Sequence, residues 1–321
     1  MDATLDWLLD ADPAIRWQVL RDLADASEVE LAGERSRVAV EGWGARLLGL
    51  QDPDGRWDGG TYRGGWIESR EEPGFDAWTA THFTVQTLRE YGVDPADPRV
   101  AEAIGRVREG VIWDRSSGLP YFDGEGEACV DGVVLSNGVY FGADTTHVLS
   151  GLLATQLGDG GWNCETDTEV SSFHSTICVL EGLLAWELAA ATGDPRIPEV
   201  RTARHRGEEY LLERRLLWRR STGELIDPRF GMLSYPARWY YDVGRALEHF
   251  RRARPEGDPR LADAIARLRV KADDEGRWRL ENDHEGPVWF RPEGEWEGTP
   301  SRWVTLRSLR VLRWWDTLSS R

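Results

Sequence analysis

The sequence has few cysteines and no long apolar segment. Only three of its 321 residues are cysteine (Cys129, Cys164 and Cys178), too sparse and odd a set for a disulfide framework. We therefore expect free thiols or metal ligands. No run of about 18 uncharged apolar residues is present, which predicts no membrane-spanning segment. The first ten residues, MDATLDWLLD, are acidic where a signal peptide would be basic, which predicts a cytoplasmic protein.

Basic residues and strand patterns are also scarce. The 39 lysines and arginines face 56 aspartates and glutamates, for a formal net charge of −17. Such a chain repels the phosphate backbone, so nucleic acid is not an expected partner. The hydrophobic content of 40% is enough for a buried core. These features predict a helical globular protein and leave its oligomeric state open.

Tryptophan, in contrast, is abundant and follows a repeat. Among the 17 tryptophans, three close the segments LLGLQDPDGRW, LLATQLGDGGW and LRVKADDEGRW, at Trp57, Trp162 and Trp278. A second motif begins at Trp113 (WDRSSG) and at Trp218 (WRRSTG). The five motifs alternate at steps of 56, 49, 56 and 60 residues. This period is typical of helical hairpins, and about six of them fit the chain.

Helical periodicity predicts two helices in each hairpin. The first helices are expected at 14–24, 75–91, 129–141, 172–190, 236–252 and 301–317. The second helices are expected at 34–50, 97–112, 144–156, 198–217 and 258–270, with a helix at 2–9 completing their ring. The first set is more apolar, which suits an inner ring, and the second is amphipathic, which suits an outer ring. The prediction is one all-α domain over residues 1–321, an (α/α)6 toroid of six helical hairpins.

The DGRW, DGGW and EGRW turns resemble the Gln-Trp repeats of squalene and terpenoid cyclases and of protein prenyltransferase β subunits. The resemblance extends from about Trp43 to Trp315. It implies that the turn tryptophans stabilise the ends of the outer helices by packing. It also implies an enzyme, a transferase or a cyclase, that acts on a small apolar, possibly isoprenoid, substrate in a central aromatic-lined cavity.

The inner helices of such a toroid begin around the central cavity, which makes this rim the expected site. Aromatic faces there stabilise cations or apolar chains, and an acid or a histidine supplies proton transfer. The candidate catalytic residues are Asp76 and His82, and the candidate substrate-binding residues are Trp78, Arg238, Trp239 and Trp303. Packing is the alternative role for His82 and for the tryptophans. The loop NDHEGPVWFRPEGEWEGTP is long enough to act as a lid.

A zinc site is predicted at the same rim. Alignment of the inner helices places Cys129 and His174 at equivalent positions of neighbouring helices, and Cys164 lies in the loop before the second of these helices. Three soft or borderline ligands with one open position suit catalytic Zn²⁺. The resemblance adds that prenyltransferase β subunits hold zinc with an Asp-x-Cys and a histidine, matched here by Glu127-Ala-Cys129 and His174. The alternative is that the cysteines are small buried hydrophobic residues.

Two other functions remain open at this stage. A metal-independent terpene cyclase protonates an alkene with the central acid of an Asp-x-Asp-Asp run, and no such run is present. The isolated acids Asp76, Asp131 and Asp242 would have to supply that proton. A non-catalytic binding scaffold is the third hypothesis, because a fold alone does not determine a function.

Overall fold

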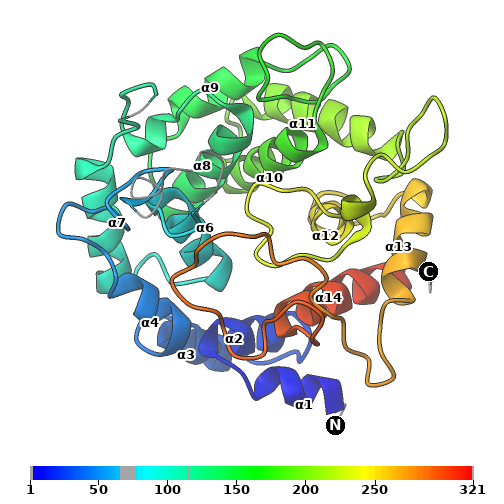
Figure 1. The fold of residues 1–321 in the computed structure, drawn as a ribbon, viewed down its shortest axis with the longest axis horizontal. Helices are drawn as coiled ribbons and strands as arrows, with labels where there is room; N and C mark the ends of the chain where they lie inside the picture. Colours follow the sequence, from blue (N-terminus) through cyan, green and yellow to red (C-terminus); the bar gives the residue numbers. More distant parts are fainter. Residues whose placement is uncertain (1–2, 66–76, 115, 320–321) are drawn as a thin grey trace.

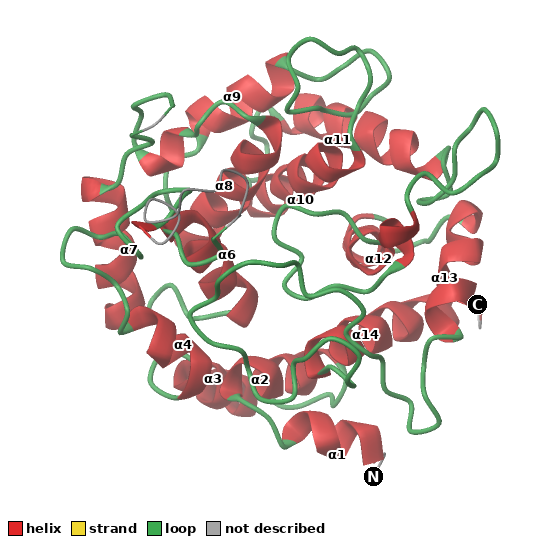
Figure 2. Cartoon of the chain, viewed as in Figure 1, coloured by secondary structure: helices red, strands yellow, loops and turns green. Residues whose placement is uncertain are grey.

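The chain folds into two concentric rings of helices (Figures 1 and 2). The computed structural model describes residues 3–65, 77–114 and 116–319, and this part holds thirteen α-helices and no β-strand, only isolated bridges. The prediction of an all-α toroid is confirmed, and the assignment of all 321 residues to one domain stays a prediction. In this part of the chain, no helix combines the length and the apolar character that a bilayer crossing requires.

Successive helices alternate between the rings. The inner ring consists of α2 (Pro13–Asp22), α6 (Thr81–Tyr91), α8 (Ala128–Phe141), α10 (Phe173–Ala189), α12 (Val243–Ala253) and α14 (Arg302–Ser319). The outer elements are α1 (Ala3–Leu9), α3 (Glu28–Arg37), α4 (Gly42–Leu48), α7 (Pro98–Gly110), α9 (Thr146–Ala154), α11 (Ile197–Leu212) and α13 (Ala262–Arg269). Short 3-10 helices cover Tyr121–Asp123, Pro228–Gly231 and Pro259–Leu261.

Two predicted helices differ from the observed ones for reasons of backbone geometry. The expected helix 34–50 is divided into α3 and α4, because Gly42 has a φ of +63°, which breaks the helical path. The expected helix 236–252 begins only at Val243. Arg238 has a φ of +55°, and the Asp242 carboxylate accepts a 2.9 Å hydrogen bond from the backbone N–H of Arg245, which caps the helix there.

The three turn tryptophans make the same set of contacts. Each indole N–H donates to the backbone carbonyl ten residues earlier, in the outer helix, at 2.7–2.8 Å. Each backbone N–H of the tryptophan donates to a threonine hydroxyl of the next inner helix, at 2.9–3.0 Å. The tryptophan, carbonyl and threonine sets are Trp57, Leu47 and Thr81; Trp162, Leu152 and Thr176; and Trp278, Leu268 and Thr305. The repeat therefore joins each outer helix to the inner helix that follows it.

Two glutamines extend these junctions to the next outer helix. The Gln51 amide donates to the carbonyls of Gly55 (3.0 Å) and Ala103 (2.9 Å), and Ala103 belongs to α7. Gln156 bonds in the same way to Gly160 and to Ala203 of α11. Each glutamine thus ties its own turn to the outer helix of the next hairpin.

Replacing Thr176 with valine is expected to lower the free energy of unfolding by about 1–3 kcal/mol, because the buried N–H of Trp162 loses its acceptor. Chemical denaturation measures this change. The matched control is Thr202→Val on the exposed face of α11, which is expected to change stability by less than about 0.5 kcal/mol. Equal effects at the two positions would contradict the role given to the junction.

The interior of the ring is more ionic than the sequence pattern indicates. The Arg245 guanidinium, 4% exposed, lies 2.7 Å from the Glu181 carboxylate, joining α12 to α10. Burial opposes ionisation of Glu181, but Arg245 outweighs it and lowers the pKa of this carboxyl to about 2. The inner helices therefore carry a buried ion pair beyond their N-termini, where the sequence pattern indicated apolar side chains.

The N-terminal helix closes the ring beside the last inner helix, as predicted. The Thr4 hydroxyl of α1 donates to the Glu275 carbonyl (2.5 Å), in the third tryptophan turn. The Arg302 guanidinium, at the start of α14, donates to the Trp7 carbonyl and lies 4.8 Å from the Trp7 ring centroid. A seam between the two ends of the chain therefore completes the toroid (Figure 1).

Candidate functional site

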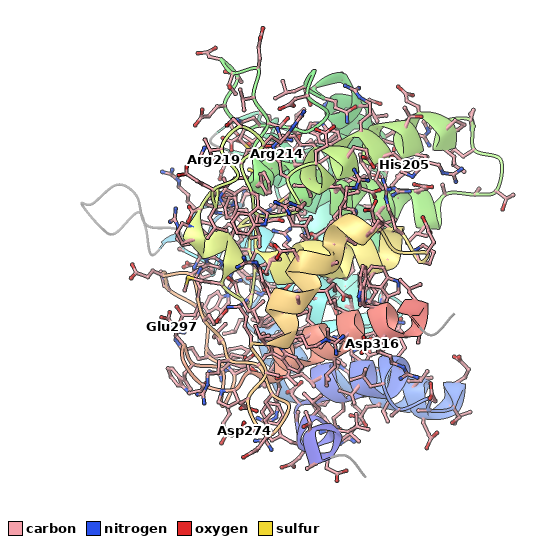
Figure 3. The ribbon with its side chains drawn as sticks, turned by 90° about the vertical axis from the view of Figure 1, so that its right-hand side faces the viewer. His205, Arg214, Arg219, Asp274, Glu297 and Asp316 are labelled. Carbon is pink, nitrogen blue, oxygen red and sulfur yellow. The ribbon has the colours of Figure 1, made fainter. Side chains whose placement is uncertain are left out.

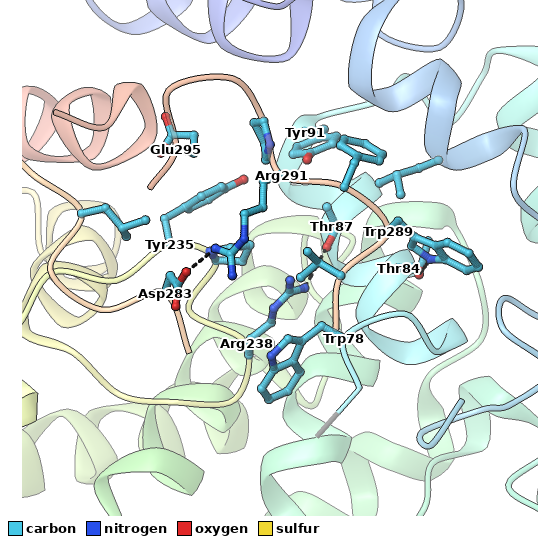
Figure 4. Close-up of a pocket in the computed structure, with 16 residues that line it drawn as sticks. Trp78, Thr84, Thr87, Tyr91, Tyr235, Arg238, Asp283, Trp289, Arg291 and Glu295 are labelled. Carbon is cyan, nitrogen blue, oxygen red and sulfur yellow. Dashed lines mark hydrogen bonds and ion pairs between the residues drawn. The ribbon is translucent and has the colours of Figure 1, made fainter. Parts of the chain in front are cut away.

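A pocket of about 60 Å³ lies between α6, the segment that precedes α12, and the loop 281–296 (Figure 4). This volume holds about four water molecules. Its wall combines aromatic rings with a few polar groups, the composition typical of small-molecule sites. Its wall includes the aromatic and polar side chains of Trp78, Tyr91, Tyr235, Trp289, Thr84, Thr87, Arg238, Asp283 and Glu295.

Two arginines line this pocket, and Arg291 is paired with Asp283 whereas Arg238 has no such partner among the described residues. Its side chain lies 5.3 Å from the Trp78 ring centroid and donates a long hydrogen bond, 3.4 Å, to the Thr87 hydroxyl (Figure 4). The residue is only 6% exposed, and no carboxylate in the described parts of the chain forms an ion pair with it. Burial lowers the pKa of Arg238 to about 10, so it remains a cation at neutral pH. A buried cation is costly, and the Glu90 charge, which raises the pKa of Arg238 without forming an ion pair with it, offsets only part of that cost, which favours an anionic ligand.

Two carboxylates line the pocket in different states. Glu295 is 5% exposed and accepts hydrogen bonds from the Ser301 hydroxyl (2.5 Å) and the backbone N–H of Arg302 (2.8 Å). Burial raises the pKa of Glu295, and both of its oxygens are committed to the start of α14. Asp283 instead pairs with Arg291 within the loop itself (Figure 4). Asp283 is therefore the carboxylate that a ligand can reach without disturbing a helix end.

The loop 281–296 is hydrogen-bonded across the ring centre. The indole N–H of Trp78 donates to the carbonyls of His284 (3.1 Å) and Glu285 (3.0 Å), and its backbone N–H donates to Pro287. The Trp289 indole returns a 3.1 Å bond to the Thr79 carbonyl. The long loop predicted at the rim thus lies over the cavity, and its movement as a lid stays a prediction.

The predicted substrate-binding residues divide into two groups. Trp78 and Arg238 line the pocket. Trp239 does not, because its ring stacks on Tyr240 with centroids 3.7 Å apart. Trp303 is 5% exposed and stacks on the far side of Tyr235 at 4.5 Å, so it supports the pocket wall and does not face the ligand space.

Of the two predicted catalytic residues, the structure describes His82 alone. Asp76 lies outside the described residues. His82 is 1% exposed, and its Nδ1 lies 3.4 Å from the Tyr121 hydroxyl. Burial lowers the pKa of His82 to about 3, so its ring stays neutral at ordinary pH. The structure places His82 in the core beside α8 and not in the pocket.

Of the three predicted zinc ligands, two are adjacent. The Cys129 and Cys164 sulfurs lie 2.6 Å apart, and a carboxylate oxygen of Glu127 lies within 4.8 Å of both. His174 is not in this group. Its Nδ1 accepts a 2.8 Å hydrogen bond from the backbone N–H of Tyr241, and burial lowers its pKa to about 4. None of the four residues lines the pocket.

The isolated acids Asp131 and Asp242 hold backbone groups. Asp242 caps α12, and Asp131 accepts a 2.8 Å hydrogen bond from the backbone N–H of Glu125. Asp131 is 8% exposed, and burial raises its pKa to about 6. These contacts are those of structural caps, and neither acid is in the pocket with Arg238.

Asp131 makes stability depend on pH. Its pKa is about 6 in the folded protein against 3.8 ordinarily, so the folded state binds more protons between these values and stability falls as pH rises. From pH 4 to pH 7 we expect a loss of about 2 kcal/mol that Asp131→Asn removes. Denaturation at several pH values measures it. Asp274→Asn, at the edge of the molecule (Figure 3), is the control and should follow the unmodified protein; matching curves for all three proteins would contradict the assignment.

Comparison with known proteins gives a fold and no family. No family model matches the chain, and no curated protein matches it. A glycosyl hydrolase of family 88 from Bacteroides vulgatus is similar in structure, with a TM-score of 0.51, 12% identity, and coverage of 99% of this chain and 91% of that one. A protein from Actinoplanes has a TM-score of 0.43 and 18% identity, with coverage of 95% and 90%.

These comparisons correct the functional expectation. A solved structure that this toroid resembles is a glycosyl hydrolase, not a terpenoid cyclase or a prenyltransferase. The predicted superfamily is therefore wrong, and with it the transferase or cyclase activity and the apolar substrate. The physical reason is that the Gln-Trp-like turns join an outer helix to an inner helix, and their tryptophans do not line the pocket. They specify ring assembly and carry no information on the reaction.

Proposed function

We propose that the chain is a glycosidase-type hydrolase whose central pocket binds a saccharide carrying a carboxylate. The observation that carries the proposal is Arg238, a buried guanidinium with no ion pair in the described parts of the chain. Its planar fork matches a carboxylate, and such a pair is strong when both groups are shielded from water. The hydrolytic half of the proposal is supported by the name of the structural neighbour, a glycosyl hydrolase.

The remaining wall suits a sugar ring. Trp78, Tyr235 and Trp289 offer aromatic faces with polar tips, which pack against the apolar face of a saccharide while leaving its hydroxyls solvated or hydrogen-bonded. The Thr84 and Thr87 hydroxyls donate to the carbonyls of Thr79 and Phe83, so each presents its oxygen to this space as an acceptor. An acidic saccharide would therefore use both the aromatic side chains and the Arg238 guanidinium of the pocket, whereas an apolar chain would leave the guanidinium unpaired.

Asp283 is the carboxylate that we assign to the reaction. Hydrolysis of a glycosidic bond needs a carboxyl group that protonates the leaving oxygen or activates the attacking water. Asp283 lines the pocket and is bound only to the loop residue Arg291. Glu295 is the second pocket carboxylate, but its bonds to Ser301 and Arg302 give it a structural role.

Substrate entry requires the loop 281–296 to move. The present cavity of about 60 Å³ has room for only a few waters. A saccharide therefore fits only when the hydrogen bonds from Trp78 to the loop and from Trp289 to Thr79 are released. Closure of such a loop over bound substrate excludes water from the reacting groups.

A paired set of oligosaccharides tests the proposal. Uronate-containing oligosaccharides and their neutral counterparts of equal length are titrated against the full chain, with tryptophan fluorescence reporting binding and new reducing ends reporting hydrolysis. We expect at least about 10-fold tighter binding of the acidic member, weakened by salt, and release of reducing ends from it. Equal binding of the pair would overturn the role of the cation, and binding without release would overturn the hydrolytic assignment.

A further inference from the structure

Two cysteines from different elements meet at one point, away from the pocket. Cys129 is in the first turn of α8, and Cys164 is in the segment that precedes α10. Their sulfurs are 2.6 Å apart, and the backbone N–H of Cys129 donates to the Cys164 sulfur at 3.2 Å. The Ser175 hydroxyl lies 3.2 Å from the same sulfur. The fold therefore places two thiols in contact, and a backbone N–H and a hydroxyl lie within hydrogen-bonding distance of one of them.

A third donor and a negative environment surround this pair. A Glu127 carboxylate oxygen lies within 4.8 Å of both sulfurs. The backbone N–H of Glu127 donates to the Glu125 carboxylate at 3.2 Å, and that of Glu125 donates to Asp131 at 2.8 Å, so three acids lie close together at the start of α8. These acids and the two thiols attract a cation, and a bound cation would in turn favour the thiolate form of both cysteines.

We propose that Glu127, Cys129 and Cys164 form a zinc site with a fourth position open to water. Two sulfur ligands select a borderline-soft divalent ion, and a carboxylate oxygen completes a set that zinc accepts. Two sulfurs on one tetrahedral zinc, each about 2.3 Å from it, lie about 3.8 Å apart, so binding must separate this pair. Cys164 is half-buried in an irregular segment, which leaves it able to make that small movement.

This site differs from the one expected from helix alignment, and it does not depend on the proposed glycosidase activity. Glu127 replaces His174, whose Nδ1 is bound to the backbone of Tyr241. None of the three ligands lines the pocket that holds Arg238.

Metal binding is tested on the reduced full-length chain. Zinc is added to metal-free protein, and its affinity is measured by competition with a chromophoric chelator. Cobalt is then used as a spectroscopic substitute. We expect one zinc per chain, a sulfur-to-cobalt charge-transfer band in the near ultraviolet, and protection of Cys129 and Cys164 from alkylation by iodoacetamide when zinc is present.

Single substitutions locate the ligands. Cys164→Ser and Glu127→Gln are each expected to weaken zinc binding, the first by at least about 100-fold, since loss of a ligand exceeds the loss of an outer-shell partner. The matched controls are Cys178→Ser, at the third and separate cysteine, and Glu125→Gln, at a neighbouring acid. Both controls are expected to retain zinc within about 10-fold.

Three results would overturn the proposal. They are the absence of stoichiometric zinc and of the cobalt band in folded, reduced protein; zinc binding that is unchanged by Cys164→Ser; and isolation of the cysteine pair as a disulfide that persists under reducing purification. If a variant does not fold, the alkylation experiment on the unmodified chain decides alone, because it requires no substitution.

Discussion

Arg238→Gln is expected to weaken binding of a carboxylate-bearing saccharide by about 100-fold, corresponding to about 2.7 kcal/mol. The carboxylate would lose a shielded, charge-assisted hydrogen-bonding partner, which typically costs 2–5 kcal/mol, so about 100-fold is a conservative figure. Binding of the neutral counterpart should change by less than about threefold. The free protein is expected to become no less stable, because glutamine removes a buried charge that has no ion pair in the described parts of the chain. Calorimetric titration and chemical denaturation measure the two effects.

Two controls separate charge recognition from packing. Arg238→Lys keeps the charge but loses the planar fork, and an intermediate loss of about 10-fold is expected. Arg219→Gln removes an arginine at the surface of the molecule (Figure 3) and should leave both affinities unchanged. If acidic and neutral saccharides were weakened equally by Arg238→Gln, the guanidinium would be a packing element and the substrate class would be wrong.

Asp283→Asn is expected to lower kcat by about 10²–10⁴-fold, the usual contribution of a general acid or base. The amide has nearly the same shape as the carboxylate, so KM should remain within about threefold of its original value. Steady-state hydrolysis of the acidic saccharide identified in the binding experiment measures both constants. The combination of a large loss in kcat with an unchanged KM is what distinguishes a reacting group from a binding group.

The other pocket carboxylate provides the comparison. Glu295→Gln should leave the bond from the Ser301 hydroxyl possible but weaken the cap on α14, lowering the free energy of unfolding by about 1 kcal/mol with little effect on kcat. The assignment would be reversed by a Glu295→Gln variant that is stable and inactive beside an Asp283→Asn variant that retains turnover.

The ring itself could be predicted because its determinants are local. Each turn tryptophan lies at a fixed distance from the helix carbonyl that it contacts, as Trp57 and Leu47 illustrate, so the repeat is visible along the chain. The same locality explains the error in function. The turn tryptophans bond an outer helix to an inner helix and do not line the central pocket, on which ligand recognition depends.

The candidate site was only partly predictable. Trp78 and Arg238 lie close before the inner helices α6 and α12, where alignment of the hairpins places the rim. Asp283 and Glu295 belong to a loop without periodicity. Its first half is held over the pocket by hydrogen bonds between residues some 200 apart, such as that from Trp78 to His284. Spacing alone contains no signal for such contacts.

Alignment of the inner helices predicts which residues lie close together better than it predicts which side chains face one another. It correctly brings Cys129 near the start of α10, but the side chain that contacts Cys164 there is Ser175, one residue beyond His174. Successive residues on a helix point about 100° apart, so a one-residue difference changes which group meets the thiols.

The seam between α1 and α14 affects how the chain is made. Thr4 bonds to Glu275, and Trp7 bonds to Arg302, so α1, which also packs on α2, meets these later partners only after residue 302 has been translated. Until α14 is made, the inner ring lacks the helix that packs between α12 and α2, and the apolar side chains facing it stay uncovered. A nascent chain stalled before residue 302 would therefore expose an apolar surface that favours aggregation and binds chaperones.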